Sequence, residues 1–239
     1  MCMPVILKKS NHINNVGFIS TRIAGMDGVS LEIAKWADVL ERNGYNCFYF
    51  AGEIDRDPGR CYLCEPAHFE HPDISAMNKS LFGITKRSPD LTGKIIRIKN
   101  HLKQCLYEFQ RTYNLDLIIP ENALTIPMNI PLGIAITEFI AEQAIPAIAH
   151  HHDFYWERDR FQINACQDYI RYAFPPDLFC IQHVVINSLA SRQLSHRLGI
   201  SNTVIPNVYD FANPPAPSGR KSELRKQIGL GENDLFVLQ

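Results

Sequence analysis

"LDLIIPENALTIPMNIPLGIAITEFIAEQAIPAIAHH", residues 115–151, decides the fold class of this 239-residue chain. Its first six residues predict a buried strand, residues 129–144 predict a mostly apolar helix, and residues 145–151 predict a second strand. Both strands are mostly apolar instead of alternating with polar residues. That pattern is typical of a parallel sheet covered by helices on both faces.

The same alternation of strand and helix continues on both sides of this segment. Together the elements predict an α/β fold, a doubly wound, Rossmann-like parallel sheet. We expect further strands at 15–20, 46–52, 61–65, 179–187 and 202–207, and further helices at 29–43, 92–112, 162–172 and 188–199.

The character of the chain changes after residue 209. Residues 1–209 are expected to form one Rossmann-like domain, and "DFANPPAPSG" (210–219), with three prolines in ten residues, predicts a linker. Residues 220–239 predict a short helix at about 220–228 and then an apolar strand, "LFVLQ". A single strand cannot bury itself. We therefore expect residues 220–239 to be the start of a second domain whose remainder is missing.

Composition excludes several classes of protein. The formal net charge is -1, which argues against a nucleic-acid binder, and no apolar run is long enough to cross a bilayer. The first residues lack the pattern of a signal peptide, so cytoplasmic location is expected.

Seven cysteines are scattered along the chain, an odd number that does not suggest a disulfide framework. One cluster within "CYLCEPAHFEH" offers four soft ligands for zinc: Cys61, Cys64, His68 and His71. Its spacing is much shorter than in the usual zinc modules. We therefore favour a strand followed by a loop and predict no metal here.

Ligands of open parallel sheets bind at the carboxyl ends of the strands. The first loop there, "STRIAGMDGVS" (20–30), carries Gly25 and Gly28 before a helix, which suits a phosphate or a sugar hydroxyl. The alternative is a glycine turn in which Asp27 or Ser30 caps the helix. In the second loop Glu121 and Asn122 follow a strand directly, and recognition of hydroxyl groups and a capped turn are equally supported.

The third loop lies in "IPAIAHHHDFYWERDRF" (145–161). Alternation along a strand places His150 and His152 on one face and His151 on the other. With Asp153 and Arg158 they offer donors and acceptors for a sugar or phosphate, the interpretation we favour. A metal-dependent hydrolase built on His150, His152 and Asp153 remains as an alternative.

Three motifs, in order, resemble the group 1 glycosyltransferases, the large retaining family 4 with the GT-B fold. They are "GVSLEIAKWADVLERNGYNCFYFAGE" (28–53), "ENALTIPMNIPLGIAITEFIAEQAIPAIAHHHDFYWERDRF" (121–161) and "VIPNVYDF" (204–211). The resemblance covers about residues 14–239. It implies the amino-terminal, acceptor-side half of such an enzyme, which transfers a hexose from a nucleotide-sugar to an acceptor hydroxyl.

The resemblance also implies site residues. His152 matches the family's strand-end histidine, which contacts the transferred sugar, and it is the expected catalytic residue. No separate cofactor is expected beyond a UDP- or GDP-sugar as co-substrate. The expected substrate-binding residues are Gly25, Asp27, Gly28, Glu121, Asn122, His150, Asp153, Arg158 and Asn207.

The chain departs from the family in one large respect. The carboxy-terminal half, with its glutamates and basic pair for the donor, is absent, so we expect the chain alone to be inactive. A stand-alone sugar- or nucleotide-binding module and one subunit of a two-chain transferase remain as alternatives. In residues 54–92 a solvated charged face is favoured over a membrane-facing lip formed by Lys79, Lys86, Arg87 and Lys94.

Overall fold

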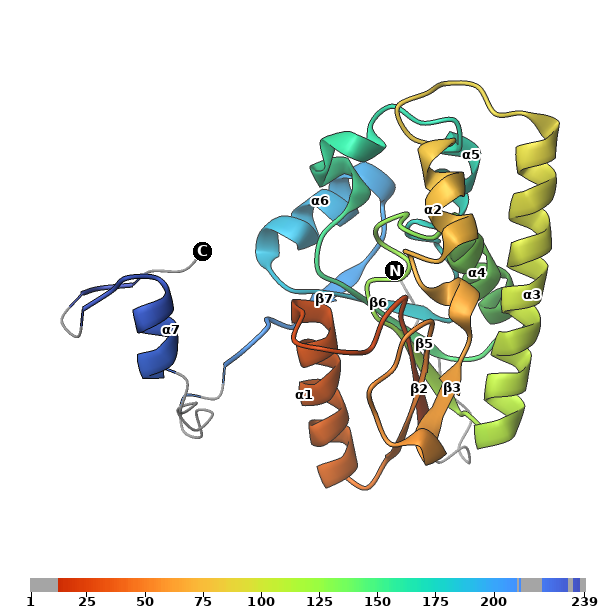
Figure 1. Cartoon of the computed structure of the whole chain (residues 1–239). Coiled ribbons are helices and arrows are strands. Elements are labelled where there is room, and N and C mark those ends of the chain that lie inside the picture. Colours follow the sequence, from red (N-terminus) through yellow and green to blue (C-terminus); the bar gives the residue numbers. More distant parts are fainter. Residues whose placement is uncertain (1–12, 210, 212–220, 232–233, 237–239) are drawn as a thin grey trace. The chain divides into compact units, whose positions relative to one another are not determined.

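The computed structural model describes residues 13–209, 211, 221–231 and 234–236. The chain divides into two compact units, Met1–Pro206 and Asn207–Gln239. The larger unit is built on a seven-stranded sheet in the order β3-β2-β1-β4-β5-β6-β7, in which every neighbouring pair is parallel. Helices cover the sheet on both faces (Figure 1). The predicted doubly wound α/β fold is confirmed.

The elements follow one another in near-regular alternation. The strands are β1 (Asn15–Ile19), β2 (Asn46–Ala51), β3 (Cys61–Leu63), β4 (Leu117–Pro120), β5 (Ala147–His151), β6 (Ile181–Val185) and β7 (Asn202–Val204). The α-helices of the larger unit are α1 (Gly28–Arg42), α2 (Pro72–Lys79), α3 (Pro89–Tyr113), α4 (Ile130–Gln143), α5 (Gln167–Ala173) and α6 (Ser188–Leu198).

Apolar side chains on the two faces of the sheet form separate cores. On one face Val16 and Phe18 of β1 pack with Ile33 of α1. On the other face Ile118 of β4 and Leu106 of α3 belong to a second core to which α4 also contributes. Because successive strand residues point to opposite faces, fully apolar strands supply both cores at once.

The strand order reverses beside β1. The chain runs from β1 outward to β2 and β3, and α3 then returns it to β4 on the other side of β1. The carboxyl ends of β1 and β4 therefore lie next to each other, with β5 adjoining β4. Such a reversal is the usual place for a ligand in an open α/β sheet. The three loops singled out in the sequence follow β1, β4 and β5.

Two helices depart from the sequence prediction for local reasons. The helix α2 was not predicted at all. It begins at a cap that is hard to recognise, where the Nδ1 atom of His71 accepts a hydrogen bond from the backbone N–H of Asp73. The helix α5 begins at Gln167 and not at residue 162, because the side chain of Asn164 accepts the N–H of Cys166 and holds a turn before it.

The smaller unit contains the helix α7 (Lys221–Gln227), close to the predicted helix at 220–228. The predicted linker at 210–219 lies, except for Phe211, outside the described residues, as does most of the predicted final strand. Its described members, Leu235 and Phe236, are exposed and in no strand. Within the described part of the chain, no helix combines the length and the apolar character needed to span a membrane.

Candidate functional site

Hydrogen bonds join the loops after β1, β4 and β5 at the switch point. The backbone N–H of Glu121 donates to the carbonyl of Ile19 at 2.8 Å, and the N–H of Asn122 donates to the carbonyl of His150 at 2.9 Å. The hydroxyl of Ser20 donates to the Glu121 carbonyl at 3.0 Å. The predicted residues at the ends of β4 and β5 are therefore held together by the sheet itself.

Glu121 lies at the centre of this group and is fully buried. Its Oε1 atom lies 2.6 Å from Nε2 of His152, with which it forms a hydrogen bond, and 2.7 Å from Nδ1 of His150. The contact with His150 is close, but its geometry is not that of a hydrogen bond, and Oε2 of Glu121 has no hydrogen-bond partner among the described residues. A buried carboxylate is costly unless it is paired, and the hydrogen bond between Glu121 and His152 pairs this carboxylate and holds the His152 ring in place.

The two histidines differ in their access to solvent. His150 is fully buried, and its ring lies 4.7 Å from the ring of Trp36 on α1. His152 is partly exposed, and Oδ1 of Asn122 accepts its backbone N–H at 3.2 Å. The two rings lie 4.8 Å apart on one face, as strand alternation predicts. Of the pair, only His152 can reach a ligand without rearrangement.

Asp153 and Arg158 form an ion pair beside this group. The Nε–H group of Arg158 donates to Oδ2 of Asp153 at 2.6 Å, and the side chain of Asn122 donates to the other oxygen at 3.3 Å. Asn122 has a φ of 54°, a left-handed conformation that asparagine tolerates better than most residues. Asp153 therefore does not join His150 and His152, as the hydrolase alternative required. The residue that joins them is Glu121.

The glycine loop is shaped by its own polar groups. Gly25 has a φ of +76°, and its N–H donates to Asp55 at 2.7 Å. Asp27 caps α1 by accepting the N–H groups of Val29 and Ser30, each at 3.1 Å. These donors would otherwise be available to a phosphate. The capping alternative weighed in the sequence is thus realised, while a Cβ at Gly28 would meet no atom within 4 Å.

The environment of Asp27 keeps its carboxyl ionised. Partial burial raises its pKa, but hydrogen bonds from Ser30 and the charge of Arg22 outweigh it, so that the pKa falls below the ordinary value of 3.8. The nearest guanidinium nitrogen of Arg22 lies 3.1 Å from the carboxylate.

The three loops enclose a cavity of about 200 Å³. Four predicted site residues line it, namely Asp27, Glu121, Asn122 and Arg158, and the other lining residues are Ser20, Thr21, Arg22, Val29, Phe69, Ile126 and Met128. The remaining predicted residues of the larger unit, Gly25, Gly28, His150, His152 and Asp153, stand in the same three loops without lining the cavity. Asn207 is exposed and belongs to the smaller unit.

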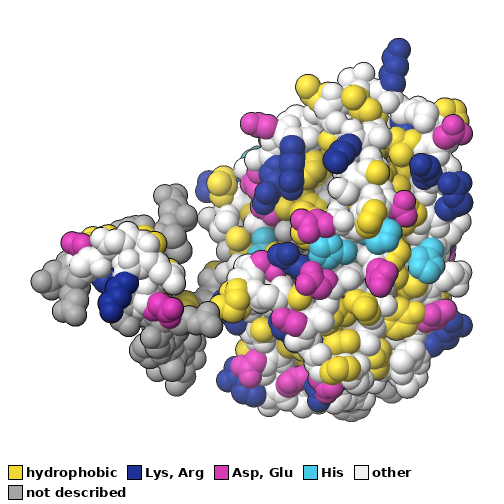
Figure 2. Space-filling model, viewed as in Figure 1, with side chains coloured by type: hydrophobic (Ala, Val, Ile, Leu, Met, Phe, Trp, Pro, Cys, Tyr) yellow, Lys and Arg dark blue, Asp and Glu magenta, His cyan; other side chains and the backbone are white. Residues whose placement is uncertain are grey.

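Two residues that line this cavity, Arg22 and Phe69, are not among the predicted site residues. Arg22 lies inside the glycine loop quoted above. A basic side chain in the same loop as two glycines could have indicated a site for an anionic or polar ligand. Phe69 arrives from the segment before α2, and no pattern in the sequence indicates that this segment reaches the switch point. Figure 2 shows histidines among acidic and basic side chains across the middle of the visible face of the larger unit.

A second series of polar side-chain contacts lies on the opposite face of β5. Nε2 of His151 lies 2.9 Å from Nδ1 of His183 on β6, and Nδ1 of His151 contacts the hydroxyl of Thr125. Burial lowers the pKa of His151 well below 6.5 and that of His183 to about 4. Both rings are therefore neutral near pH 7, and they tie β5, β6 and the loop after β4 together.

The four soft ligands of "CYLCEPAHFEH" do not assemble into a metal site. His68 contacts Glu53 at 3.3 Å, His71 caps α2, and Cys61 stands within β3. The favoured strand and loop are what the structure contains. Cys64 instead lies near two residues of α3.

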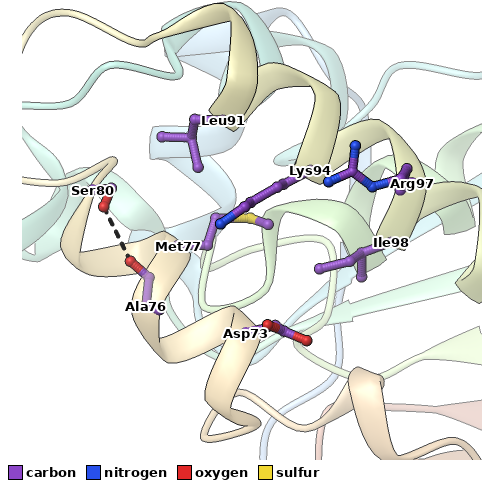
Figure 3. Close-up of a pocket in the computed structure, with 8 residues that line it drawn as sticks. All are labelled: Asp73, Ala76, Met77, Ser80, Leu91, Lys94, Arg97 and Ile98. Atoms are coloured by element: carbon purple, nitrogen blue, oxygen red, sulfur yellow. Dashed lines mark hydrogen bonds between the residues drawn. The ribbon is translucent and has the colours of Figure 1, made fainter.

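A larger hollow of about 260 Å³ lies between α2 and α3 (Figure 3). Lys94 and Arg97 stand on one side of it, and Asp73 and Met77 stand on the other. It contains none of the predicted site residues, whereas four of them line the cavity at the switch point, so that cavity is the candidate site. Of the four basic residues of the suggested lip, Arg87 is bound to Asp168, with 2.7 Å between the nearest atoms.

The sequence of the chain is similar to the sequences of known proteins. No protein-family model matches the chain. Two curated relatives, both named mannosylglucosylglycerate synthase, come from Thermotoga maritima and Petrotoga mobilis. They are 31% and 32% identical to the chain over 229 residues, and each match covers 94% of this chain and 52% of the relative.

Two solved structures are more distant. One is a lipopolysaccharide outer core galactosyltransferase, WaaB, in its apo form, with a TM-score of 0.48 and 12% identity over 84% of this chain and 49% of that chain. The other is an alpha-glucosyltransferase in complex with UDP-glucose and DNA containing an abasic site, with a TM-score of 0.35 and 11% identity over 84% and 43%. By sequence, the chain is thus similar to two mannosylglucosylglycerate synthases along nearly its whole length, and it spans about half of theirs.

Proposed function

We propose that this chain supplies one wall of the sugar-transfer site of a retaining glycosyltransferase with the GT-B fold. The observation that carries the proposal is the sequence similarity to two mannosylglucosylglycerate synthases over 94% of the chain. The cavity at the switch point supports it independently, because a sugar site needs several donors and acceptors close together.

The name of the relatives suggests the substrates. Mannosylglucosylglycerate is a mannose joined to glucosylglycerate, so we propose transfer of a mannosyl group from a nucleotide-sugar to a hydroxyl of glucosylglycerate. The donor would be a GDP- or UDP-sugar. The cavity of about 200 Å³ is small for such a substrate pair, which agrees with a site that has further walls.

Within this proposal His152 contacts the transferred sugar, and Glu121 positions it. The hydrogen bond of 2.6 Å from Nε2 to the buried carboxylate fixes the orientation of the ring. It also sets which nitrogen carries the proton, because a carboxylate can only accept. Asn122 and Arg158 line the cavity and offer donors to the acceptor hydroxyls.

Stabilisation of the leaving diphosphate is assigned to a region outside this chain. The helix N-terminus nearest the cavity is already capped by the anionic Asp27, so α1 offers little to a second anion. Electrostatic stabilisation of developing charge is usually a large part of catalysis. The chain alone should therefore be inactive, and either a covalently attached domain or a second chain would complete the enzyme.

Product formation tests the proposal. The longest natural polypeptide that contains this sequence should be incubated with GDP- or UDP-mannose and glucosylglycerate, and the product identified by mass spectrometry. Replacing His152 by alanine should lower kcat/KM at least about a hundredfold, the usual scale for a group that acts in the transition state. His196→Ala, an exposed change on α6, should leave it unchanged. Unaltered turnover in the His152 variant would refute the assigned role.

Binding measurements separate the alternatives. If the chain is a stand-alone binding module, calorimetry on the chain itself should detect binding of glucosylglycerate or a nucleotide-sugar. In that case, longer polypeptides that contain this sequence should not transfer sugar. If it is one subunit of two, transfer should appear only when the second chain is added. A metal-dependent hydrolase on His150, His152 and Asp153 gains no support from the geometry, because Asp153 is bound to Arg158.

A further inference from the structure

A second group of chemically reactive side chains lies at the β3 edge of the sheet. Its members are Cys64, His101 and Cys105, and one ligand atom of each lies within 4.8 Å of the others. The distance from Sγ of Cys105 to Nε2 of His101 is 3.8 Å. We propose that these three side chains bind a soft divalent cation of the Zn²⁺ type.

The fold brings the three residues together from separate segments. His101 and Cys105 are one helical turn apart on α3, so their side chains share a face of the helix. Cys64 directly follows β3, where its backbone N–H donates to the carbonyl of Ala51 at 2.9 Å. The hydroxyl of Tyr113, on α3, donates to the carbonyl of Cys61, on β3, at 2.9 Å and ties the helix to this edge.

The spacing suits tetrahedral coordination. Zinc bonds of about 2.3 Å to sulfur and about 2.0 Å to nitrogen place neighbouring ligand atoms about 3.5–3.8 Å apart. The 3.8 Å separation of His101 and Cys105 is close to this, and the ligand atom of Cys64 lies within 4.8 Å of both others. The three residues therefore need only a small adjustment to enclose an ion.

The surroundings suit a metal that keeps one open position. Cys64 and Cys105 are 4% and 8% exposed, which protects the thiols, while His101 is exposed and its ring can turn toward an ion. Binding would displace one proton from each thiol, and the imidazole would bind through a neutral nitrogen. The group has three protein ligands, so water would take the fourth position.

This site is separate from the cavity at the switch point. None of its three residues lines that cavity, so the ion would stabilise the packing of α3 on the β3 edge without taking part in sugar transfer. All six described cysteines are free thiols. A disulfide between Cys64 and Cys105 is the competing chemistry and would exclude the ion.

Cobalt titration of the reduced chain tests the inference. One equivalent of Co²⁺ should produce the near-ultraviolet charge-transfer absorption of a cobalt–thiolate bond, and one equivalent of Zn²⁺ should abolish it. Zn²⁺ should also raise Tm, because it binds the folded state in preference to the unfolded chain.

Three variants distinguish a specific metal site from nonspecific binding of Co²⁺ to thiols. Cys105→Ser should abolish the absorption and the rise in Tm. His101→Ala removes an exposed side chain, so it should fold normally and weaken Co²⁺ binding at least about tenfold. Cys61→Ser, the same change three residues before Cys64, should bind like the unaltered chain. The inference is overturned if one equivalent of Co²⁺ produces no charge-transfer absorption, or if His101→Ala binds Co²⁺ as tightly as the unaltered chain. It is also overturned if the native protein has a mass two hydrogens below that of the reduced chain, as a disulfide would give, and binds no cobalt.

Discussion

Lowering the pH from about 7 to about 5 should destabilise the fold through His183, a buried residue of β6. Its Nδ1 atom lies 2.9 Å from Nε2 of His151, and it is 2% exposed. Burial lowers the pKa of His183 from 6.5 to about 4 in the folded chain, whereas the unfolded chain keeps the ordinary value. Between these two values the unfolded state binds a proton that the folded state does not.

The sign and size of the effect follow from this difference. Because the unfolded state binds more protons between pH 4 and 6.5, the free energy of unfolding falls as the pH falls through that window. Each pKa unit is worth about 1.4 kcal/mol, so the full effect is about 3 kcal/mol, of which about 2 kcal/mol appears by about pH 5. His151, whose pKa is also lowered by burial, acts in the same direction.

Denaturant unfolding followed by the fluorescence of Trp36 and Trp156 measures this effect at each pH. His183→Asn keeps a polar atom near the position of Nδ1 and removes the titrating ring, so its stability should depend less on pH by about 2 kcal/mol over this range. His196→Asn, an exposed histidine on α6, should retain the pH dependence of the unaltered chain. If His183→Asn and the unaltered chain lose the same free energy, the assignment to His183 is refuted.

Other substitutions test the fold and the site. Gly52→Ala should lower the free energy of unfolding by at least about 2 kcal/mol, because its Cβ would lie 2.1 Å from a backbone nitrogen. In the same denaturant assay Gly28→Ala should be neutral or stabilise by up to about 1 kcal/mol, because its Cβ would meet no atom within 4 Å. Asp27→Ala should cost about 1–2 kcal/mol through loss of the α1 cap. Its lowered folded pKa means that this contribution is present above about pH 4 and is lost as the pH falls further, which unfolding at pH 7 and pH 3 would reveal. Glu121→Gln should lower kcat more than it changes KM and should shift the pH profile of kcat, because glutamine has nearly the same size as glutamate but replaces the carboxylate that binds His152 with a neutral amide. An unchanged pH profile of kcat would contradict the positioning role of Glu121.

Much of the larger unit could be predicted because its strands are simple. The apolar segments around 115–151 identify a parallel sheet, and alternation correctly separates His150 and His152 from His151. The helix α2 escaped prediction because a histidine cap and few apolar positions mark it, and both are weak local signals.

The site was predicted in part for a different physical reason. Residues at strand ends can be read from the sequence, so Glu121 and Asn122 could be predicted to lie at this edge of the sheet. Their neighbours depend on strand order, which no local pattern contains. The sharing of one buried carboxylate by two histidines, the partner His183 and the arrival of Phe69 all depend on that order.

We propose that this chain forms part of a retaining sugar-transfer site. Nuclear magnetic resonance of the reaction between a nucleotide-mannose, glucosylglycerate and the longest natural polypeptide containing this chain tests it most directly. We expect a new anomeric signal with the same configuration as the donor, absent when His152 is replaced by alanine. Inversion at the anomeric carbon would contradict the retaining assignment, and absence of transfer from every nucleotide-sugar, with or without a second chain, would contradict the claim itself.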